Sequence, residues 1–189
     1  MPRDLPIRLG LAGLEAAVEG QPGLPPVERW NPPYCGDSEM RIASDGTWFH
    51  QGSVVTRPAL VRLFSTILRK DDEGFMLVTP VEKLSIQVED APFTAVRVDR
   101  DGEALRFTTN VGDEVEAGPE NPIRVQMDAA TGEPRPYVHV RRGLEALILR
   151  PVFYELAEMA EPHETPDGAR MCVASHGAWF QVGPVADAA

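Results

Sequence analysis

The sequence predicts an α+β fold of two small sheet-rich subdomains, each with a helix on an antiparallel sheet, behind a proline-rich N-terminal arm. Three observations support this prediction. Short alternating apolar runs flank Asp-Gly and Thr-Gly pairs, which are typical of β-hairpins. Two segments, which begin near Arg57 and Arg150, have the spacing of amphipathic helices. Residues 40–54 (MRIASDGTWFHQGSV) also return as residues 171–185 (MCVASHGAWFQVGPV), with eight of fifteen positions identical.

Length and composition limit the class of protein. A chain of 189 residues suits one ordinary domain or two small ones, and its core needs no disulfide for stability. The hydrophobic fraction of 43% is that of a soluble globular protein. A net charge of −11 opposes binding to phosphate backbones, so we expect no nucleic-acid partner. The sequence shows neither a membrane-length apolar run nor a signal-sequence pattern, so we expect no membrane partner and a cytoplasmic location.

We expect three regions: a proline-rich arm (1–34), a first hairpin-helix-hairpin subdomain (35–91), and a second hairpin-rich subdomain with a helix and a returning C-terminal hairpin (92–189). Seven of the eighteen prolines lie in the arm, which disfavours regular structure there. Leu9, Leu11, Leu14 and Val18 predict a short helix within it, and Trp30 and Tyr34 are the expected anchors.

In the first subdomain, Asp45-Gly46 predicts a hairpin with a two-residue loop. Thr56 is expected to cap a helix that has Pro58 in its first turn and that ends at the acidic run 71–74. Residues 75–79 and 84–88 are expected to be strands of the same sheet as the hairpin.

The second subdomain has more hairpin signals. The expected elements are strands 94–98 and 104–109 around Asp101-Gly102, an acidic loop at 112–121, strands 123–127 and 136–140 around Thr131-Gly132, a helix at 151–160, a second acidic loop at 161–168, and the returning hairpin. Residues 144–149 fit either a helix or a strand. On the helix, Phe153, Leu156, Ala157 and Ala160 are expected to share the buried face.

The two helices begin alike, with Arg57-Pro58 and Arg150-Pro151 at the same distance before a leucine. The hairpin repeat is offset by 131 residues, however, and the helix repeat by 93. One tandem duplication gives one offset, so the repeat is either a rearranged duplication or two convergent solutions to one packing problem. In both cases we expect an aromatic hairpin to pack on a helix twice.

Several blocks, in this order, resemble a bacterial family known as domain of unknown function 1285: CGDSEMRIASDGTWFHQGS, RPALVRLFSTILRK, LVTPVEKLSIQVEDAPF, PYVHVRRGLEALILRPVFYELAE and HGAWFQVG. The resemblance covers roughly residues 25–183. It implies two small sheet-rich subdomains, one more like a β-roll and one with more helix. It implies no activity, cofactor or catalytic residue.

One set of residues suggests a catalytic site. His50 lies two residues after Trp48 on the same strand face, and Glu82 or Asp90 from neighbouring strands is the expected partner that orients it as a general base. The weak catalytic candidates are therefore His50 and Glu82. Gln181 replaces His50 in the second copy of the repeat, and this favours packing as the reason for the motif.

A second set suggests an anion site. Arg57 and Arg150 stand where helix N-termini favour negative charge, and Arg141, Arg142 and the pair Phe153-Tyr154 are candidates to complete a pocket beside the C-terminal helix. Each arginine could instead pack its stem and bond a nearby carbonyl. Lys83 beside Glu82 predicts either a buried ion pair or an exposed turn. The candidate ligand-binding residues are Trp48, His50, Arg57, Lys83, Arg150, Tyr154 and Trp179.

No cofactor motif is present, and Cys35, Cys172 and the histidines lack the short paired spacings of zinc sites, so we expect no metal and no cofactor. Our hypothesis is a non-enzymatic binding module for a small anionic or amphipathic ligand, or for a protein partner. The alternative is a hydrolase-like enzyme that uses His50 with Glu82 or Asp90. Open strand edges also favour a homodimer.

Overall fold

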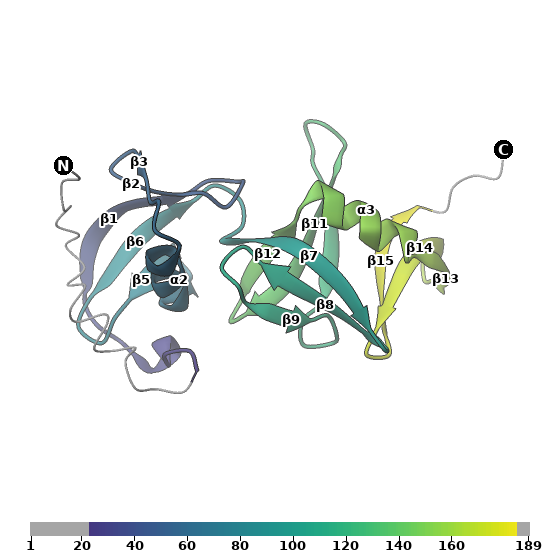
Figure 1. Cartoon of the computed structure of the whole chain (residues 1–189), viewed down its shortest axis with the longest axis horizontal. Coiled ribbons are helices and arrows are strands. Elements are labelled where there is room, and N and C mark those ends of the chain that lie inside the picture. Colours follow the sequence, from purple (N-terminus) through teal and green to yellow (C-terminus); the bar gives the residue numbers. More distant parts are fainter. Residues whose placement is uncertain (1–22, 185–189) are drawn as a thin grey trace. The chain divides into compact units, whose positions relative to one another are not determined.

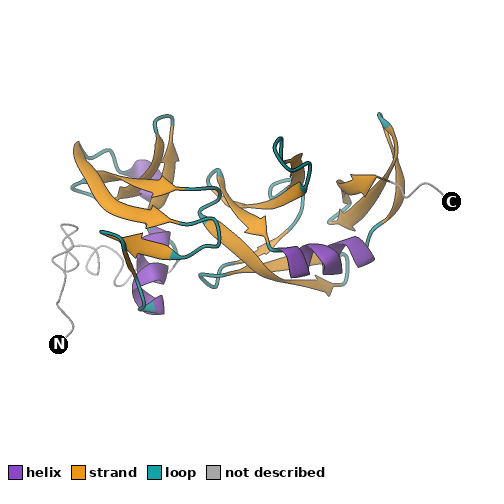
Figure 2. Cartoon of the chain, turned by 90° about the horizontal axis from the view of Figure 1, so that it is seen from above, coloured by secondary structure: helices purple, strands orange, loops and turns teal. Residues whose placement is uncertain are grey.

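The structure, a computed structural model, describes residues 23–184, which fall into two compact units that meet in the chain between Glu89 and Asp90 (Figure 1). We call them the first and the second domain. Strands are the main regular structure of both (Figure 2). The helices are η1 (Val27–Arg29, a single 3-10 turn), α2 (Pro58–Thr66) and α3 (Arg150–Glu158). The α+β class and the two sheet-rich halves are therefore confirmed, whereas most of the predicted arm, with its helix around Leu9–Val18, lies outside the described residues.

The first domain contains one six-stranded sheet in the order β3-β2-β1-β6-β5-β4. Its strands are β1 (Tyr34–Ile42), β2 (Trp48–His50), β3 (Ser53–Val54), β4 (Leu68–Asp71), β5 (Gly74–Val78) and β6 (Lys83–Val88). Every neighbouring pair is antiparallel except β1 and β6, which are parallel. The predicted hairpin and the two later strands are confirmed as members of one sheet.

Two local predictions for this domain are wrong. The N–H of Ala43 donates to the carbonyl of Thr47 (2.9 Å), so the hairpin loop has three residues, with Gly46 at φ 86°. The N-cap of α2 is Arg57, not Thr56, and no side chain caps the helix, although Pro58 does occupy the first turn.

The end of the predicted helix is also wrong. α2 stops at Thr66, and residues 68–71 form β4, where Leu68 pairs with Leu77 and Asp71 with Gly74. The helical apolar spacing continues through Leu68, but pairing with β5 buries that residue completely and satisfies its backbone. Tertiary pairing therefore overrides the local pattern.

The core of the first domain joins the hairpin to the helix. Trp48 on β2 stacks on Phe64 of α2, with ring centroids 6.3 Å apart and planes 15° apart, and both side chains are fully buried. The expected packing of an aromatic hairpin on a helix is confirmed here.

The second domain repeats the strand order of the first. Its six-stranded sheet has the order β10-β11-β12-β7-β8-β9. The strands are β7 (Phe93–Asp101), β8 (Ala104–Thr109), β9 (Glu114–Glu116), β10 (Ile123–Met127), β11 (Pro134–Arg141) and β12 (Leu144–Ile148). Counted from β7 as the first strand, this is the order of the first domain, and again the first and last strands are parallel. The structural repeat is thus the six-stranded sheet, and not the hairpin that recurs in the sequence.

Three segments of the second domain that were not firmly predicted as strands are strands in the structure. Residues 144–148 are a strand, which settles the alternative left open by the sequence. The two predicted acidic loops each contain a strand, β9 and β13 (Glu161–Thr165). Glu114, Glu161 and Glu164 stay exposed because both strands lie at sheet edges, where one face and one edge are open to solvent.

The returning sequence motif forms β14 (Gly168–Ser175) and β15 (Ala178–Pro184), which make a three-stranded sheet with β13. Its loop has two residues, His176 and Gly177, both with positive φ (47° and 73°), as a type I′ turn requires. The first hairpin has one more loop residue. Because of this one-residue difference in register, the two hairpins turn opposite faces of the same sequence motif toward the core.

The tryptophans of the two motifs consequently differ. Trp48 is 1% exposed, whereas Trp179 is 40% exposed and stacks on His163 of β13, with ring centroids 4.0 Å apart. Phe180 is the buried member of the second pair. The second aromatic hairpin also contacts a helix, as expected, through β14 and α3, but its buried aromatic ring is Phe180 and not the tryptophan.

α3 packs against β7 and β14. Its buried residues are Val152 and Leu156, whereas Ala157 is exposed, so the predicted buried face is only partly correct. The tip of the β14–β15 hairpin is fastened to the main sheet: Ser175 Oγ accepts from the N–H of Leu105 (2.9 Å) and donates to the carbonyl of Ala117 (2.6 Å).

The different burial of the two tryptophans predicts a difference in stability. Trp48→Ala should lower the free energy of unfolding by about 3–5 kcal/mol, because it leaves a large cavity in the first domain. Trp179→Ala removes a half-exposed stack and should cost no more than about 1 kcal/mol. Urea denaturation followed by circular dichroism measures both, and equal losses would contradict the opposite orientation of the two motifs.

Candidate functional site

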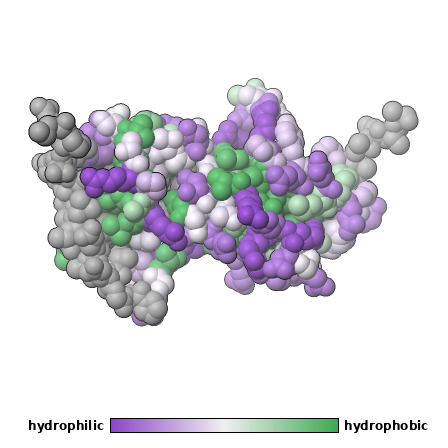
Figure 3. Space-filling view, viewed as in Figure 1, coloured by the Kyte–Doolittle hydropathy of each residue, from purple (hydrophilic) through white to green (hydrophobic). Residues whose placement is uncertain are grey.

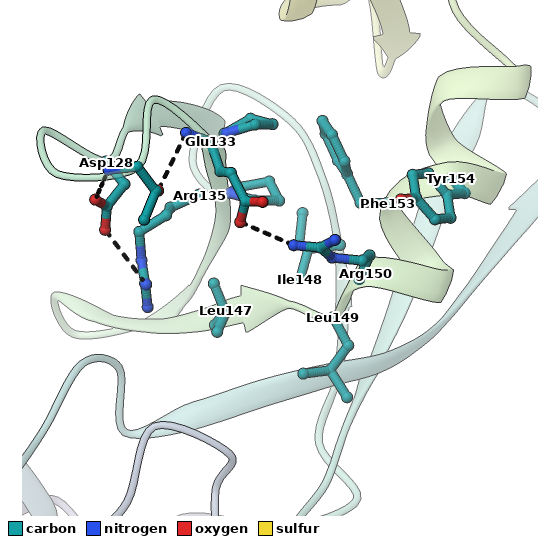
Figure 4. Close-up of a pocket in the computed structure, with 12 residues that line it drawn as sticks. Asp128, Glu133, Arg135, Leu147, Ile148, Leu149, Arg150, Phe153 and Tyr154 are labelled. Atoms are coloured by element: carbon teal, nitrogen blue, oxygen red, sulfur yellow. Dashed lines mark hydrogen bonds and ion pairs between the residues drawn. The ribbon is translucent and has the colours of Figure 1, made fainter.

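A cavity of about 490 Å³ opens in the second domain between the start of α3 and the hairpin loop that joins β10 to β11 (Figure 4). Its size lies within the range of sites for small molecules. The residues that line it are Asp128, Thr131, Glu133, Pro134, Arg135, Pro136, Leu147, Ile148, Leu149, Arg150, Phe153 and Tyr154.

The connection from β12 to α3 forms one side of the cavity. The N–H of Leu149 donates to the carbonyl of Ala95 on β7 (3.2 Å), which continues the parallel pairing one residue beyond the strand. Leu149 is also the N-cap of α3, and Pro151 fits the first turn because its missing N–H has no helical acceptor there. Arg150 and Phe153 therefore project from the first turn of α3 into the cavity (Figure 4).

The opposite side is the β10–β11 loop. Asp128 Oδ1 accepts from the N–H groups of Ala130 (2.9 Å) and Thr131 (3.0 Å), and these bonds hold the pKa of the Asp128 carboxyl below its usual value. β11 then begins with Pro134-Arg135-Pro136, in which the two prolines donate no backbone hydrogen bond.

Arg135 is fixed by several partners. It donates to Asp90 Oδ2 (2.6 Å) and to the Tyr137 hydroxyl (3.1 Å), and it lies 3.7 Å from Asp128 Oδ2. Tyr137 itself donates to Asp90 Oδ1 (2.7 Å). Burial raises the pKa of Tyr137, so its hydroxyl remains a donor over the physiological range. These bonds make Arg135 part of the wall of the cavity.

Arg150 is held more loosely. Among the described residues its ion-pair partner is Glu133, with 2.9 Å between Nη2 and Oε2. Both side chains are largely exposed, at 65% and 57%. An exposed pair of this kind contributes little to stability and is readily exchanged for another partner.

The rest of the lining is largely apolar. Phe153 lies beside Arg150 in Figure 4, whereas the side chain of Leu149 extends away from the charged pair. Leu147 and the rings of Pro134 and Pro136 also line the cavity. In the space-filling view, a hydrophobic area faces the viewer where the start of α3 meets β11 and β12 (Figure 3). The cavity thus combines an exposed ion pair with an apolar surface.

The structure brings together two of the predicted ligand-binding residues, Arg150 and Tyr154. Phe153 joins them, but Arg141 and Arg142 do not line the cavity. Arg141 instead pairs with Asp113 and lies over the ring of Phe93, 4.8 Å from its centroid. Tyr154 is 59% exposed and points away from the cavity centre (Figure 4).

Sequence reasoning missed Glu133, Arg135 and Asp128. A signal was present in the run Thr131-Gly132-Glu133-Pro134-Arg135-Pro136, where two charged residues flank a proline on a strand that was predicted to start at Pro136. Proline donates no backbone hydrogen bond and is typical of the first residues of a strand, and here residues 134–136 pair with β10 before the pairing with β12 begins at Tyr137.

The remaining candidates lie elsewhere. Trp48 and His50 are buried in the first domain, where Trp48 Nε1 and His50 Nδ1 have no hydrogen-bond partner among the described residues. The N–H of Glu82 bonds Thr79 Oγ1 in the β5–β6 turn (3.1 Å), and the Asp90 carboxylate accepts from Arg135 and Tyr137. Neither carboxylate orients the Nδ1 atom of His50.

Lys83 belongs to a half-buried charge network in the first domain. Its Nζ lies 3.0 Å from Asp71 Oδ2, and Arg69 makes a bidentate pair with the same carboxylate at 2.5 and 2.8 Å. Arg69 also donates to the carbonyls of Val27 (2.9 Å) and Trp30 (2.8 Å), so the network ties the segment before β1 to the sheet. Trp30 is thus held through its backbone, whereas Tyr34, the other expected anchor, is 57% exposed.

Across residues 23–184, no three His, Cys, Asp or Glu side chains converge into a group that could hold a metal ion. Cys35 is exposed and Cys172 is buried, and burial raises the pKa of the Cys172 thiol. Over the same residues, no helix has both the length and the apolar character that crossing a bilayer requires.

Two family models match the chain in succession. Residues 25–91 match "Domain of unknown function (DUF1285), N-terminal domain", and residues 92–182 match "Protein of unknown function (DUF1285), C-terminal domain". No curated protein matches the chain.

Solved structures of the same family resemble the chain. A DUF1285 family protein from Silicibacter pomeroyi DSS-3 shares 51% sequence identity and a TM-score of 0.82, with 93% of this chain and 94% of that chain covered. A DUF1285 family protein from Shewanella baltica OS155 shares 26% identity and a TM-score of 0.52, with 63% of this chain and 90% of that chain covered.

The charge network of the first domain predicts a pH-dependent stability. Hydrogen bonds from Arg69, and then from Lys83, lower the pKa of Asp71, so its contribution is complete above the unfolded-state pKa of about 3.9 and is lost as the pH falls through the lower folded value. Asp71→Asn should cost about 2–3 kcal/mol at neutral pH. This difference from the unmodified protein should shrink below a pH of about 4.

Denaturation curves recorded across this pH range measure the effect. Asp72→Asn is the matched control, because Asp72 is the exposed neighbour on the β4–β5 turn. A loss for Asp71→Asn that stays constant down to pH 2, or an equal loss for Asp72→Asn, would contradict the role of this network.

Proposed function

The chain belongs to the DUF1285 family, and we propose that it is a non-enzymatic binding module for a small amphipathic ligand that carries an anionic group. The ligand occupies the cavity at the start of α3. The observation that carries this proposal is the combination, in one cavity of ligand size, of a loosely paired arginine with an apolar surface.

Arg150 is the group that supports an anionic ligand. A guanidinium binds a carboxylate through charge-assisted hydrogen bonds, which are about twice as strong as neutral ones. Glu133 competes for it only through an exposed pair. Arg150 also lies on the first turn of α3, which has no side-chain cap, so the helix adds partial positive charge at the same place.

The apolar surface supports an amphipathic ligand over a small inorganic ion. Leu147, Leu149 and Phe153 offer area that a hydrocarbon group covers with a gain of about 25 cal/mol per Å². An ion such as sulfate leaves that area exposed to water. The two kinds of surface together require a ligand with a charged end and an apolar body.

The residue types in the cavity support binding over catalysis. Among the described residues that line it, none is His, Cys, Ser or Lys, four side chains that frequently act as a general base or a nucleophile. Backbone hydrogen bonds lower the pKa of Asp128 and make it a weaker base, and Glu133 lies beside the positive charge of Arg150.

The proposal predicts that binding depends on Arg150. Titration calorimetry with small amphipathic carboxylates, with and without an α-amino group, should detect one site per chain with a Kd of about 1 mM or tighter. Arg150→Gln should weaken that binding by about tenfold or more, because it removes the charge that holds the carboxylate.

Arg57→Gln is the matched control, since Arg57 has the same place before a proline at the start of α2 but lies outside the cavity. It should bind like the unmodified protein. Equal weakening by both variants would contradict this location for the site. If no compound binds at all, the protein-partner alternative takes the place of a small ligand.

A further inference from the structure

We infer that the ligand of this cavity is a zwitterion with an apolar body, of the class of the apolar α-amino acids, with its carboxylate on Arg150 and its ammonium group on Glu133. This inference rests on the proposed function and names its ligand class. It follows from how the charges of the cavity are paired.

The charged residues of the cavity fall into two groups. Arg135 is balanced by Asp90 and Asp128, and its hydrogen bonds to Asp90 and Tyr137 hold it in place. Arg150 and Glu133 balance each other, and both are largely exposed. A ligand therefore meets one exchangeable positive charge and, directly beside it, one exchangeable negative charge.

A simple anion is poorly matched to this arrangement. When its carboxylate takes Arg150, Glu133 loses the partner that it has at 2.9 Å and is left beside the bound anion. Two like charges at such a distance repel each other, and the net charge of −11 on the chain adds to the repulsion. A simple cation that binds Glu133 leaves Arg150 without its ion-pair partner in the same way.

A zwitterion avoids both costs. Its carboxylate replaces Glu133 on Arg150, and its ammonium group replaces Arg150 on Glu133, so one ion pair becomes two and no charge is left unpaired. Because Arg150 Nη2 and Glu133 Oε2 start in direct contact, the two charges of the ligand must also lie close together. The carboxylate and ammonium group on one carbon of an α-amino acid meet this requirement.

The apolar residues next to the ion pair favour a ligand with an apolar side chain. Phe153 of the first turn of α3 lies beside Arg150, and Leu147 of β12 lines the same cavity (Figure 4). A side chain such as that of leucine or phenylalanine packs on this surface while the charged end stays at the pair. A polar side chain gains no such burial, so the apolar members of the class are favoured.

Two matched sets of compounds test the inference by titration calorimetry on the full chain. The first is L-leucine, 4-methylpentanoate and 3-methylbutylamine. The second is L-phenylalanine, 3-phenylpropanoate and 2-phenylethylamine. In at least one set the amino acid should bind about tenfold or more tightly than the acid or the amine that lacks one of its charges.

Glu133→Gln supplies the second readout. It should remove the preference for the amino acid over the acid, because the acid no longer faces an unpaired carboxylate. Arg150→Gln should weaken both the amino acid and the acid. Both positions are exposed, so unchanged thermal unfolding will show that the variants are folded.

The two proposals fail in different ways. If the acid binds as tightly as the amino acid, or if Glu133→Gln keeps the preference, the zwitterion inference is wrong while the binding site stands. If none of the six compounds binds, the proposed function itself is overturned.

Discussion

Parallel pairing between the first and last strands of each six-stranded sheet is the constraint on which the rest of the fold depends. β1 pairs with β6, and β7 pairs with β12, where Phe93 meets Ala146 and Ala95 meets Ile148. Each pair joins the two antiparallel three-stranded halves of its sheet. Because the paired residues are far apart in sequence, closing them is costly in chain entropy, and burial on both strands must offset that cost.

In the second domain the parallel pairing of β7 with β12 also positions one wall of the cavity. The β7–β12 pairing ends with the bond from Leu149 to Ala95, so the chain enters α3 at a fixed point above the sheet. From the far side α3 is supported by β14, whose hairpin tip is fastened through Ser175 to the main sheet. The returning sequence motif therefore supports the helix that carries Arg150, and it does not reproduce the first hairpin.

The sequence predicted the turns and helix starts, which depend on neighbouring residues, but not the segments whose structure depends on a partner strand. Asp-Gly pairs located the hairpins, and the Arg-Pro starts located both helices, because turn preferences and the fit of proline to a first helical turn act over a few residues. Residues 68–71 and 161–165 were misassigned because a partner strand, invisible in the sequence, determines their state. Arg150 was found from its helix start, but Glu133 was not, since only the β10–β11 register brings it to the helix.

Amide chemical-shift mapping of the ¹⁵N-labelled chain, titrated with L-leucine or L-phenylalanine, locates a ligand without any substitution and so tests the binding site at the start of α3. We expect saturable shifts for the amides of Glu133, Leu149, Arg150 and Phe153, with residues of the first domain such as Arg57 and Lys83 unchanged. Saturable shifts centred on Trp48 and His50, or spread without a focus, would contradict a binding site at the start of α3.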